Sequence, residues 1–305
     1  MKKWVWTGSI LLVLGFLLCF PKEALSASRL GLDLWFGTLV PTLLPFLILS
    51  GFLIHSGLVR LLASLFSPVL GRLFSVSPEG SYVIFTGFLC GYPVGAKVLG
   101  DLSRNQKIHP EEARYLLSFC NNVSPSFVIT FLVTEQLQDQ RFLLPALLIL
   151  YGIPLLYGLL TKVSYLKRKS QVPFLDIKNA SKNQITFELL DACIYDAINI
   201  LLKLGGYVIL FSVLAKMLNQ LPILSTTAVS IGTGILEITT GTAKIAATFP
   251  KENAFRILLP LTAFGGLCSL AQTISVLKGS GLSILRYAAA KLQIALLVFL
   301  VSLFL

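Results

Sequence analysis

The sequence predicts an all-α polytopic membrane protein, with an N-terminal helix followed by two inverted repeats that each carry a re-entrant helical hairpin. The first observation is the composition. Of the 305 residues, 55% are hydrophobic and 13% are charged, and the mean hydropathy is +0.81, whereas soluble domains carry about 25% charged residues. The second observation is that two apolar segments, residues 86–98 and 233–245, both contain glycine breaks and a lysine.

The apolar stretches set the number of membrane crossings. A spanning helix needs roughly 20 mostly apolar residues. The stretches that meet or approach this length are Trp4–Phe20, Leu30–Val59, Tyr115–Val133, Phe142–Leu160, Ala192–Leu218, Phe255–Leu277 and Ile284–Leu305. We therefore expect about seven spans.

Residues 1–29 form an N-terminal segment with two interpretations. Lys2 and Lys3 precede an apolar run, and small residues follow at Ala24–Ala27. This pattern fits a cleavable signal peptide or an uncleaved first span. Both interpretations place residue 30 on the outer side of the membrane. With the interrupted segments treated as re-entrant, most of the 25 basic residues then fall on the cytoplasmic side, as the positive-inside rule requires.

Several classes of function are excluded by the residue pattern. The net charge of +11 comes from basic residues spread among loops, which is typical of membrane insertion and not of nucleic-acid binding. The five cysteines and two histidines have no metal-ligand spacing, so we expect no metal and no cofactor. No arrangement places a base beside a nucleophile, so an enzyme is not expected.

An internal repeat divides the chain. Residues 86–98 and 233–245 share Thr, Gly, Leu, Ala and Lys at the same offsets. Weaker matches lie upstream and downstream in the same order. We predict a first repeat over residues 30–160, a basic cytoplasmic linker over 161–184 and a second repeat over 185–305. Interrupted segments at corresponding positions of inverted halves indicate the substrate site of a transporter.

The first hairpin supplies four predicted substrate-binding residues. Gly91, Tyr92 and Pro93 interrupt an apolar helix, since proline lacks an N–H and disfavours helix in the preceding residue. Broken backbone at membrane depth is tolerated beside protein or a water-filled cavity. Free N–H groups and Lys97 would attract an anion there. Alternatively, Lys97 extends to the cytoplasmic interface and binds nothing.

The second hairpin repeats the pattern with different residues. Thr239, Thr240 and Gly241 stand where the first copy has Tyr-Pro-Val, and Lys244 corresponds to Lys97. All four are predicted to bind substrate. Glu237 is a candidate for proton or cation coupling because an acid at this depth is functional by default. It could equally be an ion-pair partner of Lys244.

Polar residues also interrupt two predicted spans. Asn121, Asn122, Ser124 and Ser126 surround a proline in the first repeat, and Gln272 lies in the corresponding span of the second. Helix–helix packing is one interpretation of such residues. The adjacent amides point to different faces, so we prefer a polar cavity lining and include these residues in the substrate site.

Gly91–Lys97 (GYPVGAK), Phe119–Phe127 (FCNNVSPSF) and the duplicated order resemble sporulation integral membrane proteins of the YlbJ (SpoVV) type, which are built from nucleoside-recognition gate domains. The resemblance implies two re-entrant hairpins that meet at mid-membrane, as in concentrative nucleoside transporters. It also implies export of dipicolinic acid from the mother cell across the outer forespore membrane. A ring flanked by two carboxylates suits two lysines and the ring of Tyr92.

Two other functions stay open at this point. One is transport of a nucleoside or another small solute by a protein that keeps the gate fold, and the other is a membrane scaffold that recruits sporulation proteins through residues 161–184. The expected partners are the lipid bilayer and a small anionic substrate, dipicolinate, with no nucleic acid. Homo-oligomerisation is left open.

Overall fold

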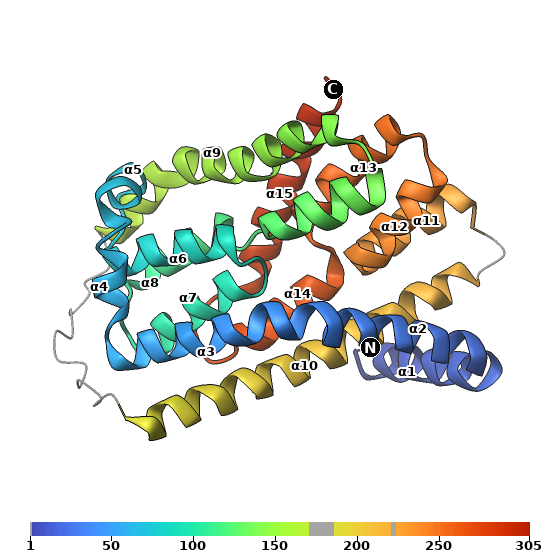
Figure 1. The fold of residues 1–305 in the computed structure, drawn as a ribbon, viewed down its shortest axis with the longest axis horizontal. Helices are drawn as coiled ribbons and strands as arrows, with labels where there is room; N and C mark the ends of the chain where they lie inside the picture. The colour runs from blue at the N-terminus through green and yellow to red at the C-terminus, as the bar shows by residue number, and fades with distance from the viewer. Residues whose placement is uncertain (1, 171–185, 221–223) are drawn as a thin grey trace.

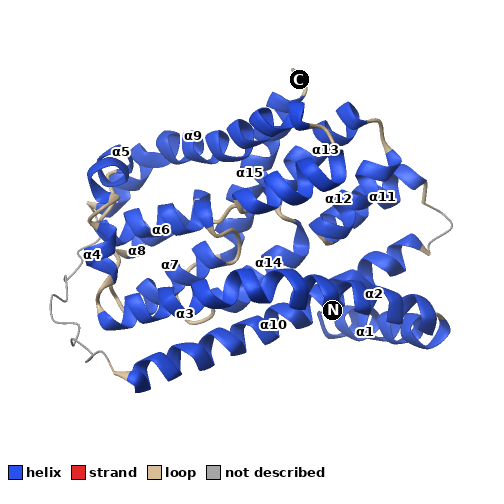
Figure 2. Cartoon of the chain, in the orientation of Figure 1, coloured by secondary structure: helices blue, strands red, loops and turns tan. Residues whose placement is uncertain are grey.

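The computed structural model describes residues 2–170, 186–220 and 224–305, and these residues form helices and connecting loops with no strand (Figures 1 and 2). The predicted all-helical class is confirmed. Five helical stretches are long and apolar enough to cross a membrane: Pro21–Ser56, Gln140–Lys169, Phe187–Asn219, Lys251–Leu277 and Ile284–Ser302. Two predicted spans are not among these five. Trp4–Phe20 contains the shorter apolar stretch Ile10–Cys19, and Tyr115–Val133 is divided at residues 120–126.

The first part of the chain forms a long rod with a short helix folded back on it. α1 (Lys2–Cys19) turns into α2 (Pro21–Leu34), which continues through a π-helical turn, η1 (Trp35–Leu39), into α3 (Val40–Ser56). Trp35 packs against Gly205 of α10 (Phe187–Asn219), and its Nε1 donates to the Leu201 carbonyl at 2.7 Å. The long helices α2–α3 and α10 therefore lie side by side (Figure 1).

In the rest of the first half, the second arm of a helical hairpin, residues 94–104, packs against α3. Three short pieces lead into a helical hairpin, then a divided helix and one long helix. They are α4 (Val59–Ala63), η2 (Ser67–Gly71), α5 (Arg72–Phe74), α6 (Pro78–Leu89), α7 (Val94–Arg104), α8 (Pro110–Phe119), η3 (Phe127–Leu137), η4 (Gln140–Phe142) and α9 (Leu143–Lys169). The predicted linker begins inside α9, and its residues 171–184 lie outside the described residues.

The second half has the same order of elements after its long helix. α10 is followed by a hairpin, a divided helix and a last helix. They are α11 (Thr226–Leu236), α12 (Ile238–Thr248), α13 (Lys251–Phe264), α14 (Gly266–Leu277) and α15 (Ile284–Ser302). Each half thus places a helical hairpin next to a divided helix.

Glycines bring the two arms of each hairpin into contact. A Cβ on Gly95 would lie 2.7 Å from the Cα of Gly87, and one on Gly241 would lie 2.1 Å from the Cα of Gly234. Gly87 also abuts the divided helix, because a Cβ there would lie 1.6 Å from the Cys120 carbonyl oxygen. Backbones this close exclude any side chain, so these glycines determine how the hairpins cross.

Lys107, in the loop between α7 and α8, ties the hairpin to the end of α3. Its Nζ donates to the carbonyl of Ile54 in the last turn of α3. This capping satisfies a helix-end carbonyl and favours a cation through the helix dipole. Burial nevertheless lowers the pKa of Lys107, and the nearby Glu79 only partly offsets this effect.

The Gly87 contact predicts a large loss of stability on a small change. We expect Gly87→Ala to destabilise the protein by about 3 kcal/mol, because the new methyl overlaps the backbone of residue 120. Thermal unfolding in detergent measures this. Gly152→Ala in α9 is the matched control, since nothing lies within 4 Å of the added Cβ. Equal melting temperatures for the two variants would contradict the packing argument.

Candidate functional site

The chain breaks of both halves meet in the middle of the molecule. The break between α6 and α7 occurs at Gly91 (φ 83°) and Tyr92. The break between α13 and α14 occurs at Gly265 (φ 86°), and a Cβ on Gly265 would lie 3.1 Å from the Tyr92 ring. Backbone N–H and C=O groups freed at such breaks need partners inside the protein.

Asn121 supplies a partner for one of these backbone groups and also binds two side-chain hydroxyls. Its amide Nδ2 donates to Thr273 Oγ1 at 3.1 Å and to Tyr287 Oη at 2.7 Å, and its Oδ1 accepts from the backbone N–H of Ala96 at 3.3 Å. The Lys291 Nζ donates to the Asn121 carbonyl at 3.0 Å. Asn121 therefore joins the first hairpin to α14 and α15.

We call the region where the chain breaks meet the junction. Tyr92 and Lys291 lie at its centre. Lys291 is 1% exposed, and its Nζ lies 5.9 Å from the centroid of the Tyr92 ring. The Tyr92 hydroxyl is buried, and no partner for it lies among the described residues. Pro93 follows as the N-cap of α7 without a side-chain capping bond.

Glu237 caps the second arm of the second hairpin. Its carboxylate accepts from the backbone N–H of Thr239 at 3.0 Å and of Thr240 at 2.7 Å, and also from the Thr240 hydroxyl at 2.7 Å. No ion pair joins Glu237 to Lys244 within the described part of the chain. The carboxylate thus satisfies the free N–H groups at the start of α12.

The other predicted site residues are dispersed around the junction. Asn122 donates to the Phe119 carbonyl at 2.7 Å, and Ser124 Oγ accepts from the Phe127 N–H at 3.3 Å. Gln272 is buried and contacts the Cys268 sulfur at 3.3 Å, whereas Ser126 is exposed. Lys244 is half-buried on α12, with Gly241 one turn before it in the hairpin crossing. None of these residues belongs to the lining of the cavity described below.

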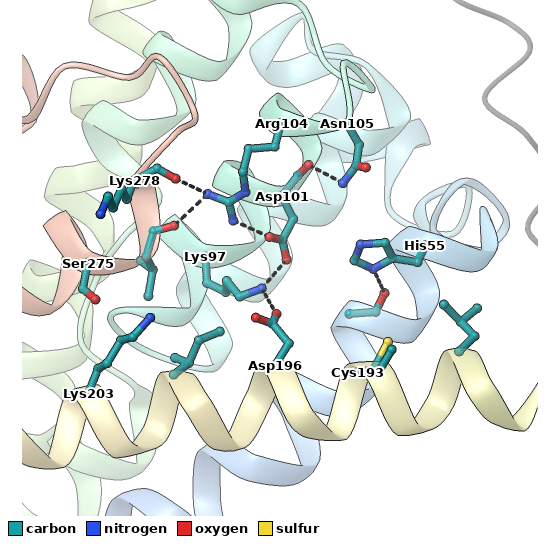
Figure 3. A pocket seen from close by; sticks show the side chains of 15 residues that line it. His55, Lys97, Asp101, Arg104, Asn105, Cys193, Asp196, Lys203, Ser275 and Lys278 are labelled. Carbon is teal, nitrogen blue, oxygen red and sulfur yellow. Dashed lines mark hydrogen bonds and ion pairs between the residues drawn. The ribbon is translucent and has the colours of Figure 1, made fainter.

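A cavity of about 560 Å³ lies beside the junction, between α3, α7, α10 and α14 (Figure 3). Small-molecule sites usually have a volume of about 300–1,000 Å³. Nine of the fifteen residues that line the cavity are charged or polar. They are His55, Lys97, Asp101, Arg104, Asn105, Asp196, Lys203, Ser275 and Lys278. Lys97 is the predicted site residue that reaches this cavity.

Lys97 sits at the centre of an ion-pair network. Its Nζ lies 2.7 Å from the Asp101 carboxylate on the same helix and 2.8 Å from the Asp196 carboxylate on α10. Asp101 also pairs with Arg104 at 2.5 Å. Arg104 in turn donates to the carbonyls of Val276 and Lys278 at 3.0 and 2.9 Å, which attaches α7 to the end of α14 (Figure 3).

Lys203 and Lys278 add two ammonium groups to the lining. Neither has a hydrogen bond or ion pair from its side chain within residues 2–170, 186–220 and 224–305. Lys203 stands sixteen residues from either end of α10, about 24 Å along the helix. A lysine in the middle of an apolar helix is costly in lipid unless water or an anion reaches it, and Lys203 is exposed and lines the cavity.

Two comparisons with known proteins find matches. Residues 36–137 match the Gate family, described as nucleoside recognition. The chain is 27% identical over 306 aligned residues, 89% of its length, to the sporulation integral membrane protein YlbJ of Bacillus subtilis, of which the alignment covers 75%. The predicted resemblance is confirmed. No solved structure matches the chain. With its five long apolar helices, the chain is an integral membrane protein like this relative.

The Gate match covers the hairpin that carries Lys97 and the break that carries Asn121. It runs from the π-helical turn η1 to the end of η3. The matched segment thus includes the part of the first half that forms the junction and one wall of the cavity. Asp196 and Lys203 lie outside this segment, on α10.

Sequence reasoning missed most of the cavity lining. Asp101 and Arg104 follow Lys97 at helical spacing, which could have indicated a shared face and an ion pair. Lys203 in the middle of an apolar span was a second available signal. Asp196 carried no such signal, because nothing in the sequence distinguishes it from Glu188 and Asp191, the other acids in the first ten residues of α10.

The Asn121 network predicts different effects at adjacent amides. We expect Asn121→Ala to destabilise the protein by about 3 kcal/mol, because it leaves a buried N–H and two hydroxyls without their partner. Asn122→Ala removes one bond to a carbonyl and should cost about 1 kcal/mol. Thermal unfolding in detergent compares them. A larger loss for Asn122→Ala would show that Asn121 does not hold the junction together.

Proposed function

We propose that the chain is a transporter that moves a small aromatic dicarboxylate, dipicolinic acid, out of the mother cell across the outer forespore membrane during sporulation. The observation that carries the proposal is the charged cavity. Three lysines line it, and two of them have no carboxylate partner in the described structure. A dianion there would pair with the ammonium groups of Lys203, in the middle of the apolar helix α10, and of Lys278, just after the end of α14.

The arrangement of the helices supports transport over a static role. Each half contains a glycine-crossed hairpin and a divided helix, and we interpret them as re-entrant elements of two inverted repeats. Broken helices that meet at the interface of inverted repeats are typical of transporters. In this interpretation the chain crosses the membrane about seven times, with residues 1–29 as an extra segment.

The position of the cavity suits export from the mother cell. His55 lies at the end of α3, Asn105 follows α7, and Leu189 lies at the start of α10, next to the basic linker. The positive-inside rule places these ends in the cytoplasm. The similarity to a sporulation integral membrane protein supports the biological setting. The proposal assigns the chain no enzymatic step and no cofactor.

The central test is solute flux into proteoliposomes that contain the purified protein. We expect labelled dipicolinate to cross and labelled uridine not to cross. Uridine flux without dipicolinate flux would favour a nucleoside transporter with the gate fold. Flux of neither solute, in vesicles with and without a pH gradient, would contradict a transport function and favour a scaffold.

The cavity lysines predict a selective loss of flux. Lys97→Ala and Lys203→Gln should each lower dipicolinate flux about tenfold, the factor expected when a charge-assisted hydrogen bond is lost. Lys167→Gln is the matched control, since this exposed lysine of α9 lies outside the cavity. Protein levels should be unchanged in all three.

Lys244→Ala distinguishes the cavity from a clamp made by both hairpin lysines. Lys244 does not line the cavity, so we expect its variant to retain flux. A loss equal to that of Lys97→Ala would instead favour the two-lysine clamp predicted from the repeat.

A further inference from the structure

Asp196 differs from the other carboxylate bound to Lys97 in burial and in origin. The Asp101 side chain is 7% exposed and belongs to the same helix as Lys97, whereas the Asp196 side chain is 57% exposed and comes from α10. Both carboxylates lie within 2.8 Å of the same ammonium group. Asp101 is therefore a fixed part of the hairpin arm, and Asp196 is a partner that reaches Lys97 across the cavity.

The hairpin arm α7 needs a second carboxylate to balance its charge, and one carboxylate can be exchanged for another at this position. Asp101 balances one of the two cations, Lys97 and Arg104, that it contacts. Asp196 supplies the second negative charge. An incoming carboxylate has the same charge and geometry as the Asp196 side chain, so it can replace Asp196 on Lys97 without leaving a buried cation unpaired. Because the Asp196 side chain is 57% exposed, its ion pair is screened by solvent, and breaking that pair costs little free energy.

We propose that Asp196 is an internal occupant of the carboxylate site on Lys97, and that the substrate displaces it when it binds. The inference rests on the proposed function and adds a regulatory step to it. The Lys97–Asp196 pair joins the hairpin arm α7 to α10. Its replacement by a substrate carboxylate releases one helix from the other, which couples binding to a movement of the hairpin.

The second carboxylate of the substrate has a partner on the same helix as Asp196. Lys203 follows Asp196 by seven residues, which is two helical turns on one face and about 10 Å of rise. In Figure 3 both side chains extend from α10 into the cavity. A dianion that displaces Asp196 therefore approaches the unpaired ammonium group of Lys203, and a monocarboxylate gains one contact fewer.

Direct binding of labelled dipicolinate to the purified full chain in detergent tests this exchange. We expect Asp196→Asn to bind dipicolinate about fivefold more tightly than the wild type, the factor expected when a half-exposed ion pair no longer competes. Asp191→Asn is the matched control: it removes the same charge from the same helix, and Asp191 is exposed and does not line the cavity. Its affinity should equal that of the wild type.

A double-mutant cycle shows whether the effect acts through Lys97. In a Lys97→Met background, the additional change Asp196→Asn should not tighten binding, because the site for which Asp196 competes is gone. A long-range effect of negative charge would tighten binding equally in both backgrounds and in Asp191→Asn. Melting temperatures of all variants without ligand show that each is folded.

Each result has a defined meaning. Tighter binding by Asp196→Asn that depends on Lys97 supports the exchange. Wild-type binding with unchanged or weaker binding by Asp196→Asn overturns it, because the ion pair is then structural, and leaves the proposed function intact. If the wild type and every variant bind no dipicolinate, the substrate assignment fails and the exchange fails with it.

Discussion

The structure depends on one constraint: backbone that leaves helical geometry inside an apolar protein must find its hydrogen-bond partners there. The two hairpins and two divided helices all break near the centre. Asn121, Glu237 and the glycine contacts satisfy or shield the freed groups. Asn121, at the break of one divided helix, accepts from the Ala96 N–H after the break of the first hairpin, whereas Glu237 serves the N–H groups of its own break.

The second organising feature is the balance of charge around the cavity. Lys97 is nearly buried and is stabilised by two carboxylates, one of which comes from the other half of the chain. Lys203 and Lys278 remain without such partners in the described structure. The cavity therefore contains one lysine that is held by two carboxylates and two lysines that have no such partner. This combination favours an anionic ligand over an uncharged one.

The junction and the cavity are two separate regions of the structure. The junction buries Tyr92 and Lys291 against the divided helices and holds the hairpin tips in place. The cavity lies on the flank of the first hairpin, where α7 faces α10. In the proposed exchange, a ligand in the cavity acts on Lys97 in α7, the helix that begins directly after the break at the junction.

The sequence by itself determined the helical class, the long apolar helices and the places where the chain breaks, because hydrophobic runs, glycine and proline act locally on the backbone. It also singled out Lys97, which lines the cavity in the structure. Only the tertiary structure decided that Lys97 meets Asp196 and that Lys203 shares its cavity, while Asn121 holds the junction together. Contacts between residues about a hundred positions apart depend on how helices cross, and that is set by packing of the whole chain.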